Sequence, residues 1–597
     1  MASEKVLINS SRMEPLPHRE LADLLVDYLA QMSVEFVFGI PGGAIEPLYN
    51  ALARSKKKGG PRPVVARHET GAAFMADGYY RQTGKLAVCC GTTGPGTTNL
   101  ITGVASAYEN HIPMLVITAQ TALSHFGRGA LQESSCTGIN TVAMFEYCTR
   151  FSTLVSHVNQ MEHKLVTAIM TAFGSPHGPA HLSIPLDILR SPSPLNAPSY
   201  NVYSLMKHPS LTDHEAIDKL CRCIEQTKKI AFLIGDGCAR SIDVILELSM
   251  LIGATVVTTP HGKGLVDPCH PLFRGVLGFA GHRSAKAALI DPEVEFIVAC
   301  GTNLGEWASN GWDREVLFNH RLIHLDSIES HLAHSPMAKL HVRGDLRSIF
   351  QRLLNHLQSV RPPAASLSTS APSAGESQRL RIQIDDSSKY NSDATPIKPQ
   401  RLMRDLARIF PPNTCFLAEA GNSQAWAIHY LHPSWPLNLG EPPFEGGRFR
   451  ACSEFVSMGW AVGAAVGTAL GTPRNPVVCI TGDGSLLMSG QEITVAIQEH
   501  LPVIYVILND SALGMVKHGQ RLAGSEPVAY ELPDIDYRAY AKAMGAEGHI
   551  IRSPQDLLDL DIAAICSRTG PTLLDVRIDP EEVPPIGTRM KVLGTSS

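Results

Sequence analysis

The chain has 597 residues, of which 44% are hydrophobic and 18% charged, with a formal net charge of −5. That length exceeds what one hydrophobic core supports, so several domains are expected. The small net charge does not indicate binding to nucleic acid or to an anionic membrane surface. The sequence contains no uncharged apolar run long enough to predict a membrane span. Thirteen scattered cysteines without CxxC spacing, and an N-terminus without an apolar signal segment, predict reduced thiols and a cytoplasmic location.

Short apolar strands alternate with longer helical stretches along the whole chain, which predicts parallel α/β layers. The strands fall into three comparable sets, expected at residues 34–40, 86–92, 114–119 and 180–185; 230–237, 255–259, 295–301 and 321–326; and 414–421, 477–484, 503–510 and 572–579. These sets predict an α/β protein with three doubly wound parallel-sheet domains. The expected limits are 14–188, 205–356 and 398–580, and the Ser/Ala/Pro-rich residues 357–397 are expected to form a flexible linker.

In the first domain, residues 67–73 read RHETGAA and precede a helix-compatible run. Glu69 has two interpretations: an acid that complements the N-terminus of a helix, or a buried carboxyl with a chemical role. The residues alone leave both open.

Two carboxylates in the last third follow neighbouring predicted strands. Residues 477–484 end in Gly482-Asp483-Gly484, and residues 503–510 end in Asn509-Asp510. If the two strands lie side by side in a parallel sheet, Asp483 and Asp510 converge at one edge. Hard oxygen ligands beside glycine amides suit Mg²⁺ bridging a diphosphate. Gly-Asp-Gly alone is also an ordinary turn.

Together these segments resemble thiamine-diphosphate-dependent enzymes of the acetolactate synthase-like family, and the resemblance covers most of the chain. Residues 67–81 are similar to the family pattern RHE-x-GA-x-x-A-x-GY-x-R, 39–44 to FG-x-PGGA, 91–99 to TSGPG-x-TN and 129–133 to DAFQE. The resemblance implies a pyrimidine-binding first domain, a central domain and a diphosphate-binding third domain. It also implies that Glu69 hydrogen-bonds the aminopyrimidine and so lets the cofactor act as its own base.

The resemblance assigns roles residue by residue. Glu69, Gln132 and Gly43 are implied as catalytic. Mg²⁺ is implied to bind Asp483, Asp510 and the main-chain carbonyl of Ala512. Met458 resembles the apolar wedge beneath the cofactor, although a methionine alone more often packs in a core. Thiamine diphosphate is implied to contact Glu69, Pro41, Asn99, Gly421, Asn422, Ser423, Met458, Gly482, Asp483, Gly484, Ser485, Asp510, Ala512, Leu513, Gly514 and Met515.

Several positions depart from the family pattern. Leu131 stands where Phe is usual, Asn422-Ser423 replace Gln-His, and Asp510 replaces an asparagine. Residues 300–309 read CGTNLGEWAS in place of G-x-RFDDR, so FAD binding is not expected. Gly519 replaces an acceptor-pocket tryptophan, which predicts room for larger acceptors.

The resemblance implies decarboxylation of a pyruvate-like 2-oxo acid and carboligation to an acceptor carbonyl. A simple decarboxylase that releases an aldehyde is the alternative; a non-catalytic homologue is disfavoured because Glu69, Asp483 and Asp510 are present. A homodimer or homotetramer is expected, with the cofactor at the subunit interface. Whether a regulatory subunit or a nucleotide binds the central domain is left open. Polar candidates for substrate handling, each of which could equally be a surface residue, are Gln132, Arg448, Arg450, Lys517 and His518.

Overall fold

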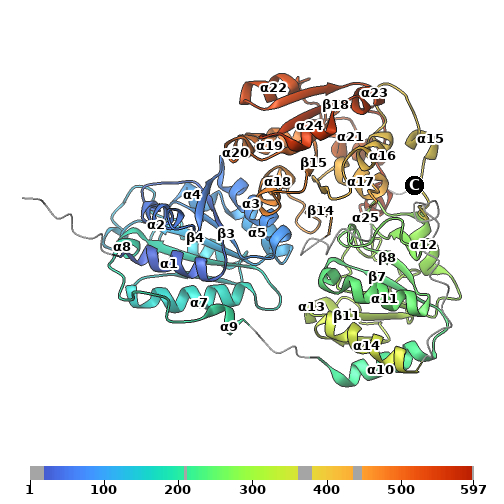
Figure 1. Cartoon of the computed structure of the whole chain (residues 1–597), viewed down its shortest axis with the longest axis horizontal. Helices are drawn as coiled ribbons and strands as arrows, with labels where there is room; N and C mark the ends of the chain where they lie inside the picture. The colour runs from blue at the N-terminus through green and yellow to red at the C-terminus, as the bar shows by residue number, and fades with distance from the viewer. Residues whose placement is uncertain (1–18, 207–211, 361–379, 435–446, 595–597) are drawn as a thin grey trace, which may run out of the picture.

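The computed structural model describes residues 19–206, 212–360, 380–434 and 447–594. These residues form three sheets of six strands, each flanked by helices (Figure 1). Every pair of neighbouring strands in the three sheets is parallel. The predicted fold class, three doubly wound α/β domains, is confirmed.

The first sheet has the strand order β2-β1-β3-β4-β6-β5. Its strands are β1 (Phe36–Gly39), β2 (Arg62–Val65), β3 (Ala87–Gly91), β4 (Met114–Gln120), β5 (Phe151–Leu154) and β6 (Pro179–Pro185). The helices that follow or cover them are α1 (Leu21–Gln31), α2 (Glu46–Lys56), α3 (Glu69–Thr83), α4 (Pro95–Thr98), α5 (Ile101–Glu109), α6 (Thr141–Glu146), α7 (Met161–Ala172) and α8 (Leu186–Arg190).

The central sheet has a different order, β12-β11-β10-β7-β8-β9, so the winding reverses between β7 and β10. Its strands are β7 (Ile230–Ile234), β8 (Thr255–Thr258), β9 (Phe273–Val276), β10 (Phe296–Cys300), β11 (Leu322–Asp326) and β12 (Leu340–Arg343). Its longer helices are α10 (His214–Gln226), α11 (Ile242–Ile252), α12 (Arg283–Ile290) and α14 (Leu346–Val360).

The third sheet, β14-β13-β15-β16-β18-β17, is wound like the first. Its strands are β13 (Cys415–Ala418), β14 (Phe449–Ala451), β15 (Val477–Gly482), β16 (Val503–Asn509), β17 (Glu547–Ile551) and β18 (Thr572–Arg577). Its helices are α16 (Pro399–Ile409), α17 (Asn422–Tyr430), α18 (Trp460–Gly471), α19 (Asp483–Ser489), α20 (Ile493–Gln498), α21 (Gly514–Ala523), α22 (Tyr537–Met544), α23 (Pro554–Leu558), α24 (Ile562–Ser567) and α25 (Gly587–Val592).

The segment expected to be a flexible linker, residues 357–397, differs from that prediction where it is described. Helix α14 continues to Val360, and residues 361–379 lie outside the described part of the chain. Beyond them, Ile382 is buried against the central core, and Lys389, in the short helix α15 (Ser387–Tyr390), forms an ion pair with Glu582 at 2.8 Å. Apolar and ionic contacts therefore attach residues 380–397 to two domains.

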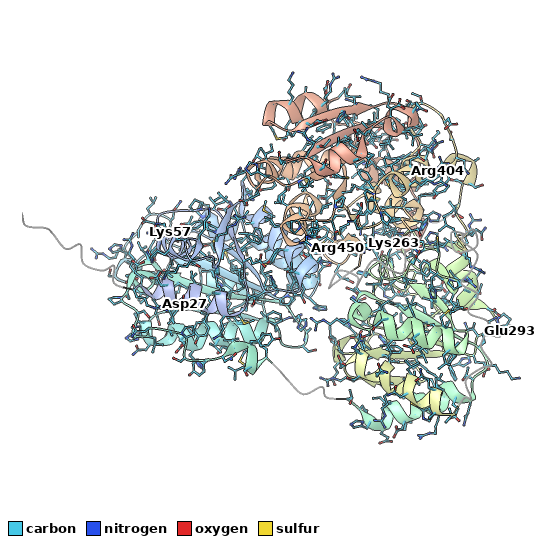
Figure 2. The ribbon with its side chains drawn as sticks, in the orientation of Figure 1. Asp27, Lys57, Lys263, Glu293, Arg404 and Arg450 are labelled. Atoms are coloured by element: carbon cyan, nitrogen blue, oxygen red, sulfur yellow. The ribbon has the colours of Figure 1, made fainter. Side chains whose placement is uncertain are left out.

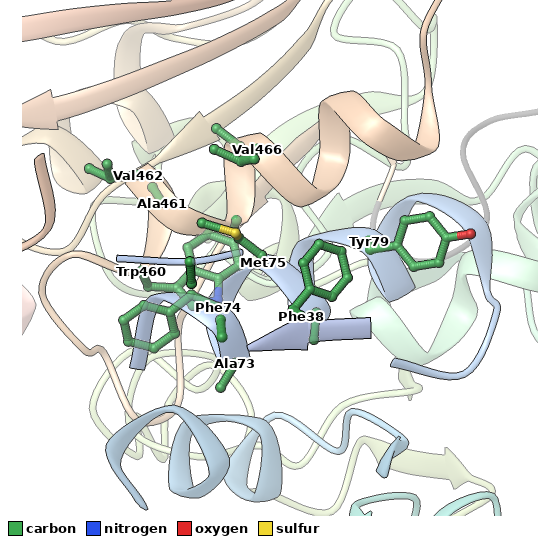
Figure 3. Packing of buried hydrophobic residues seen from close by; sticks show 14 of the residues in the cluster. Phe38, Ala73, Phe74, Met75, Tyr79, Trp460, Ala461, Val462 and Val466 are labelled. Atoms are coloured by element: carbon green, nitrogen blue, oxygen red, sulfur yellow. The ribbon is translucent and has the colours of Figure 1, made fainter. Parts of the chain in front are cut away.

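The first and third domains share one hydrophobic core, in which helix α3 lies against helix α18 (Figures 1 and 3). Glycines let the two backbones approach: a Cβ atom at Gly467 would lie 1.8 Å from the Met75 carbonyl oxygen, and one at Gly78 would lie 2.1 Å from that of Ala464. The Trp460 indole donates to the buried Asp77 carboxylate at 2.8 Å. This contact joins the middle of α3 to the first residue of α18.

The central domain is joined to the third by a buried lysine. Lys263 Nζ donates to the main-chain carbonyl of Leu431 at 2.8 Å, and Figure 2 labels Lys263 where the two domains meet. Burial lowers the pKa of Lys263 to about 7. The lysine thus satisfies a main-chain acceptor at a domain boundary.

Candidate active site

The first group of site residues surrounds the N-terminus of helix α3. Glu69 is the first residue of that helix, His68 caps it by accepting from the Thr70 amide, and the Glu69 side chain is buried. Its Oε2 accepts a hydrogen bond from Asn99 Nδ2 at 3.0 Å, and Asn99 is held in turn by Thr70 Oγ1, which donates to its carbonyl at 2.6 Å. The structure thus brings Glu69 and Asn99 together, in an arrangement that orients one carboxyl oxygen and leaves the other for a ligand.

The loop with Pro41 and Gly43 and the segment with Gln132 both contact the turn 91–99. A Cβ atom at Gly42 would lie 2.7 Å from the Thr92 side chain, whereas one at Gly43 would meet nothing within 4 Å. Thr93 Oγ1 donates to the carbonyl of Gln132 at 2.8 Å, and the Gln132 side chain is exposed. Pro41, Gly43 and Gln132 therefore border the open side of this turn, where a ligand could approach the backbone.

The second group is built on two strands of the third sheet. Strands β15 and β16 pair directly, with Gly482 opposite Leu508, so Asp483 and Asp510 follow at the same edge. The expected Gly482-Asp483-Gly484 turn is instead a helix start: Gly482 is the N-cap of α19 and Asp483 its first residue. Burial, reinforced by the neighbouring Asp510, raises the pKa of Asp483 to about 7, and burial raises that of Asp510 to about 6.

Buried polar atoms at this edge lack partners within the described residues. They are Asp483 Oδ2 and Asn422 Oδ1. Asn422 and Asp510 are neighbours, because a Cβ atom at Gly514 would lie 2.4 Å from Asn422 Nδ2 and 2.8 Å from Asp510 Oδ2. A buried carboxylate at Asp483, a half-buried one at Asp510 and an unsatisfied amide oxygen beside them are the donor set of a hard cation.

The same edge also suits an anion, because helices α17 and α21 both begin there, at Asn422 and Gly514. Main-chain amides at helix N-termini bind phosphate groups. Across the described residues, no cluster of three or more His, Cys, Asp or Glu side chains could hold a metal. The residues therefore fit Mg²⁺ held by two carboxylates, a carbonyl and the oxygens of a diphosphate.

The remaining third-domain residues surround these carboxylates. Ser423 Oγ donates to the Glu419 carbonyl at 2.8 Å, Ser485 is buried in α19, and Leu513 N donates to the Tyr530 carbonyl at 2.7 Å. Ala512 is buried between them in an isolated bridge to Glu531. Main-chain bonds thus clamp the loop from Asp510 to Leu513.

Met458 and Leu513 meet at Gly484. A Cβ atom there would lie 2.6 Å from Leu513 Cδ2 and 3.9 Å from Met458 Cε. The Met458 side chain, placed just before α18, is 39% exposed, which a core methionine would not be. The structure therefore places an apolar ledge beside the carboxylates.

The polar substrate candidates are dispersed. Lys517 is engaged by the C-terminal segment, donating to the Pro580 carbonyl at 3.0 Å and to Glu581 at 2.8 Å. His518 is buried in α21 with Nδ1 unpartnered among the described residues, and burial lowers its pKa. Arg448, directly before β14, and Arg450, within it, are buried, and Arg450 Nη2 donates to Gln82 Oε1 at 2.7 Å.

Two buried acids that were not predicted support the site. Glu492 accepts from the His68 amide at 2.9 Å and from the Arg67 amide at 3.1 Å, so it fixes the start of α3 from the third domain. Glu419 accepts from the Ala461 amide at 2.8 Å, at the start of α18. Burial raises the pKa of each to about 7. Because both bind main-chain amides distant in sequence, no local motif reveals them.

Within the described part of one chain, no hydrogen bond joins the Glu69 group to the Asp483 group. Leu131 (87% exposed) and Tyr147 (89%) lie on the first domain, and Leu487 and Met488 are exposed on α19.

No helix among the described residues is long and apolar enough to cross a membrane.

The chain is similar to known proteins along most of its length. Three family models match in order: the N-terminal TPP binding domain of thiamine pyrophosphate enzymes at residues 19–140, their central domain at 217–353 and their C-terminal TPP binding domain at 419–576. The Escherichia coli acetolactate synthase isozyme 3 large subunit is 30% identical over 548 residues, covering 90% of each chain. The isozyme 2 large subunit is 29% identical over 584 residues, covering 96% of this chain and 99% of its own. The acetolactate synthase of Arthrospira platensis is 29% identical over 571 residues, covering 94% of each chain.

Proposed function

Because this chain belongs to the thiamine-diphosphate-dependent enzymes of the acetolactate synthase type, we propose that it decarboxylates a pyruvate-like 2-oxo acid and joins the remaining unit to an acceptor carbonyl. The observation that carries the proposal is the pair of complementary half-sites in one chain. One presents a buried, oriented carboxyl at Glu69, and the other presents Asp483 and Asp510 beside two helix N-termini.

When bound, thiamine diphosphate would supply a nucleophilic carbon for the 2-oxo acid and, in its cationic ring, an electron sink for decarboxylation. Glu69, oriented by Asn99, would hold a proton at the cofactor's pyrimidine nitrogen. Asp483, Asp510 and the Ala512 carbonyl would hold Mg²⁺, and the amides at the start of α17 and α21 would bind the diphosphate. Met458 and Leu513 would support the rings, while Gln132 and Gly43 would border the reacting carbon.

The active unit is proposed to be a homodimer or homotetramer with the cofactor between subunits. Large apolar side chains are exposed on both half-sites, including Leu131 and Tyr147 on one and Met488 on the other. A partner subunit would bury these exposed apolar side chains. A partner's first domain would cover the third domain of this chain and bring Glu69 of one subunit to Asp483 of the other.

FAD is proposed to play no part, since Asn303, Glu306 and Trp307 stand in the segment where flavin-dependent relatives carry RFDDR. Freshly purified protein is expected to be colourless and to gain no activity from added FAD. A flavin absorbance band at near-stoichiometric occupancy would contradict this. All thirteen cysteines are free thiols, which supports the proposed cytoplasmic location.

The reaction is tested by supplying the protein with thiamine diphosphate, Mg²⁺ and a panel of 2-oxo acids, singly and in pairs, and identifying products by mass. Carboligation predicts a product that contains both partners minus one CO₂. A simple decarboxylase would release only aldehyde, whether or not an acceptor is present. If no product forms with any single 2-oxo acid or with any pair, the proposal is refuted.

A further inference from the structure

A cavity of about 340 Å³ lies where the three domains meet. Its walls come from α3 and the end of α5 in the first domain, the ends of β7, β10 and β11 in the central domain, and β14 in the third. Its volume falls in the range of ~300–1,000 Å³ that small-molecule sites occupy. Among the described residues that line it, none is implied to contact thiamine diphosphate. The cavity is therefore a candidate for a second ligand site.

Arg450, in the middle of β14, is a buried cation on the wall of this cavity. Only 2% of it is exposed, and Figure 2 labels it close to the junction of the domains. Its Nη2 donates to Gln82 Oε1 at 2.7 Å and its Nε to the Gly447 carbonyl at 3.3 Å, and both acceptors are neutral. Within the described part of the chain, its Nη1 has no partner. The charge of Arg450 is thus buried without an acidic partner.

Arg81 of α3 adds a second cation to the same wall. Its Nε donates to Asp77 Oδ1 at 2.5 Å, and the other oxygen of Asp77 accepts from the Trp460 indole at 2.8 Å. Both oxygens of Asp77 are therefore engaged by groups other than Arg450. Arg81 Nη2 has no partner among the described residues. Burial lowers the pKa of Arg450, and the positive charge of Arg81 lowers it further.

The acids elsewhere on the wall are paired with other groups or exposed. Glu454 pairs with His261 at 2.9 Å, and Asp326 pairs with His331 at 3.1 Å. The remaining acids are exposed side chains: Glu109, Asp236 and Asp345. Since a buried charge without a partner is unfavourable, the two arginines favour an anion in this cavity.

We propose that this cavity binds a small metabolite through a carboxylate or phosphate group, which Arg81 of the first domain and Arg450 of the third hold together. Guanidinium N–H groups match the geometry of both anions and form strong charge-assisted hydrogen bonds with them. Because the walls belong to three domains, the ligand would link the first and third domains to the central one. The inference does not depend on the reaction proposed above, since the cavity and the cofactor site are lined by different residues.

Binding is tested by equilibrium dialysis of labelled inorganic phosphate, and separately of labelled succinate, against the holoenzyme. Saturating thiamine diphosphate and Mg²⁺ keep the helix N-termini of α17 and α21 occupied, so any further ion must bind elsewhere. One bound ion per chain is expected in the wild type. Arg450→Met keeps an unbranched side chain without the charge and should weaken binding by about tenfold or more, with Arg450→Lys in between.

Arg240→Gln is the matched control for the dialysis. Arg240 lines the same cavity but is exposed, so its loss should change the affinity by less than about twofold. Tighter binding of phosphate would assign the site to a phosphate ester, and tighter binding of succinate to an organic acid. If no ion binds beyond the cofactor, or if Arg450→Met binds as tightly as the wild type, the proposal is overturned.

Stability distinguishes a ligand-binding arginine from a structural one. In a buffer without polyvalent anions, Arg450→Met should have a urea midpoint equal to or above that of the wild type, because it removes a buried charge that has no acidic partner. Succinate, added at constant ionic strength, should then raise the midpoint of the wild type more than that of Arg450→Met. Effects of the anion on the solvent act on both proteins alike. An equal response of the two proteins to succinate would assign Arg450 a structural role instead.

Discussion

Replacing Gly467 by alanine tests whether the contact between helices α3 and α18 holds the site together. The added Cβ atom would lie 1.8 Å from the Met75 carbonyl oxygen and 2.9 Å from the Tyr79 amide nitrogen. Both are main-chain atoms, which cannot rotate away, so the helices must separate until the first distance exceeds 3.0 Å. Overpacking of this kind costs about 1–3 kcal/mol, more than the ~1 kcal/mol that alanine gains over glycine inside a helix.

The site should respond as well as the stability. Glu69 begins α3 and Met458 precedes α18, so a shift between the helices would misplace two residues that we propose contact the cofactor. We expect Gly467→Ala to lower the urea midpoint and to weaken thiamine diphosphate binding, both measured on the purified protein. Gly519→Ala is the stability control: it is also inside a helix, its Cβ meets nothing within 4 Å, and it should gain about 0.5–1 kcal/mol. A Gly467→Ala protein as stable as wild type would refute the reasoning.

Three further outcomes are expected. Glu69→Gln should reduce turnover by ~10²–10⁴-fold while the protein stays folded; near-wild-type turnover would remove Glu69 from cofactor activation. Mg²⁺-dependent binding of thiamine diphosphate should strengthen from about pH 5 to pH 8, because Asp483 and Asp510, with pKa values of about 7 and about 6, must lose protons to bind the ion; titration calorimetry should show this pH dependence in wild type and weaker binding in Asp483→Ala, and a flat profile would contradict it. Mixing inactive Glu69→Ala and Asp483→Ala proteins should restore part of the activity through hybrid dimers, whereas no recovery despite proven subunit exchange would mean that each chain builds its own site.

The sequence predicted the inner strands of every sheet and missed every edge strand, for one physical reason. Strands such as β4 and β16 are buried on both faces and appear as continuous apolar runs. The two edge strands of each sheet (β2, β5, β9, β12, β14 and β17) are short and mixed, and β5 is only partly buried at all four residues. An edge strand pairs with only one neighbour and is less buried, so its sequence needs no continuous apolar run.

The site followed the same rule. Asp483 and Asp510 were predictable because each directly follows an apolar strand, and the Gly482-Asp483-Gly484 pattern marks one of them. Glu492 was not, because it binds the amides of Arg67 and His68, more than 420 positions away. A cavity lined by Phe279, Trp307 and Arg589 likewise joins segments that are distant in the sequence. Contacts between residues of different domains produce no periodic pattern in the sequence around either residue.

The first and third domains wind their strands in the same order, and α3 and α18 follow corresponding strands, β2 and β14. The helices that meet are therefore counterparts, and their contact has the character of an isologous interface between two copies of one protein, contained here in one chain. A glycine on each helix lies against the backbone of the other: Gly78 faces Ala464, and Gly467 faces Met75. A larger side chain on one helix requires a smaller one at the facing position of the other. Substitutions along this contact are therefore expected to be tolerated in compensating pairs.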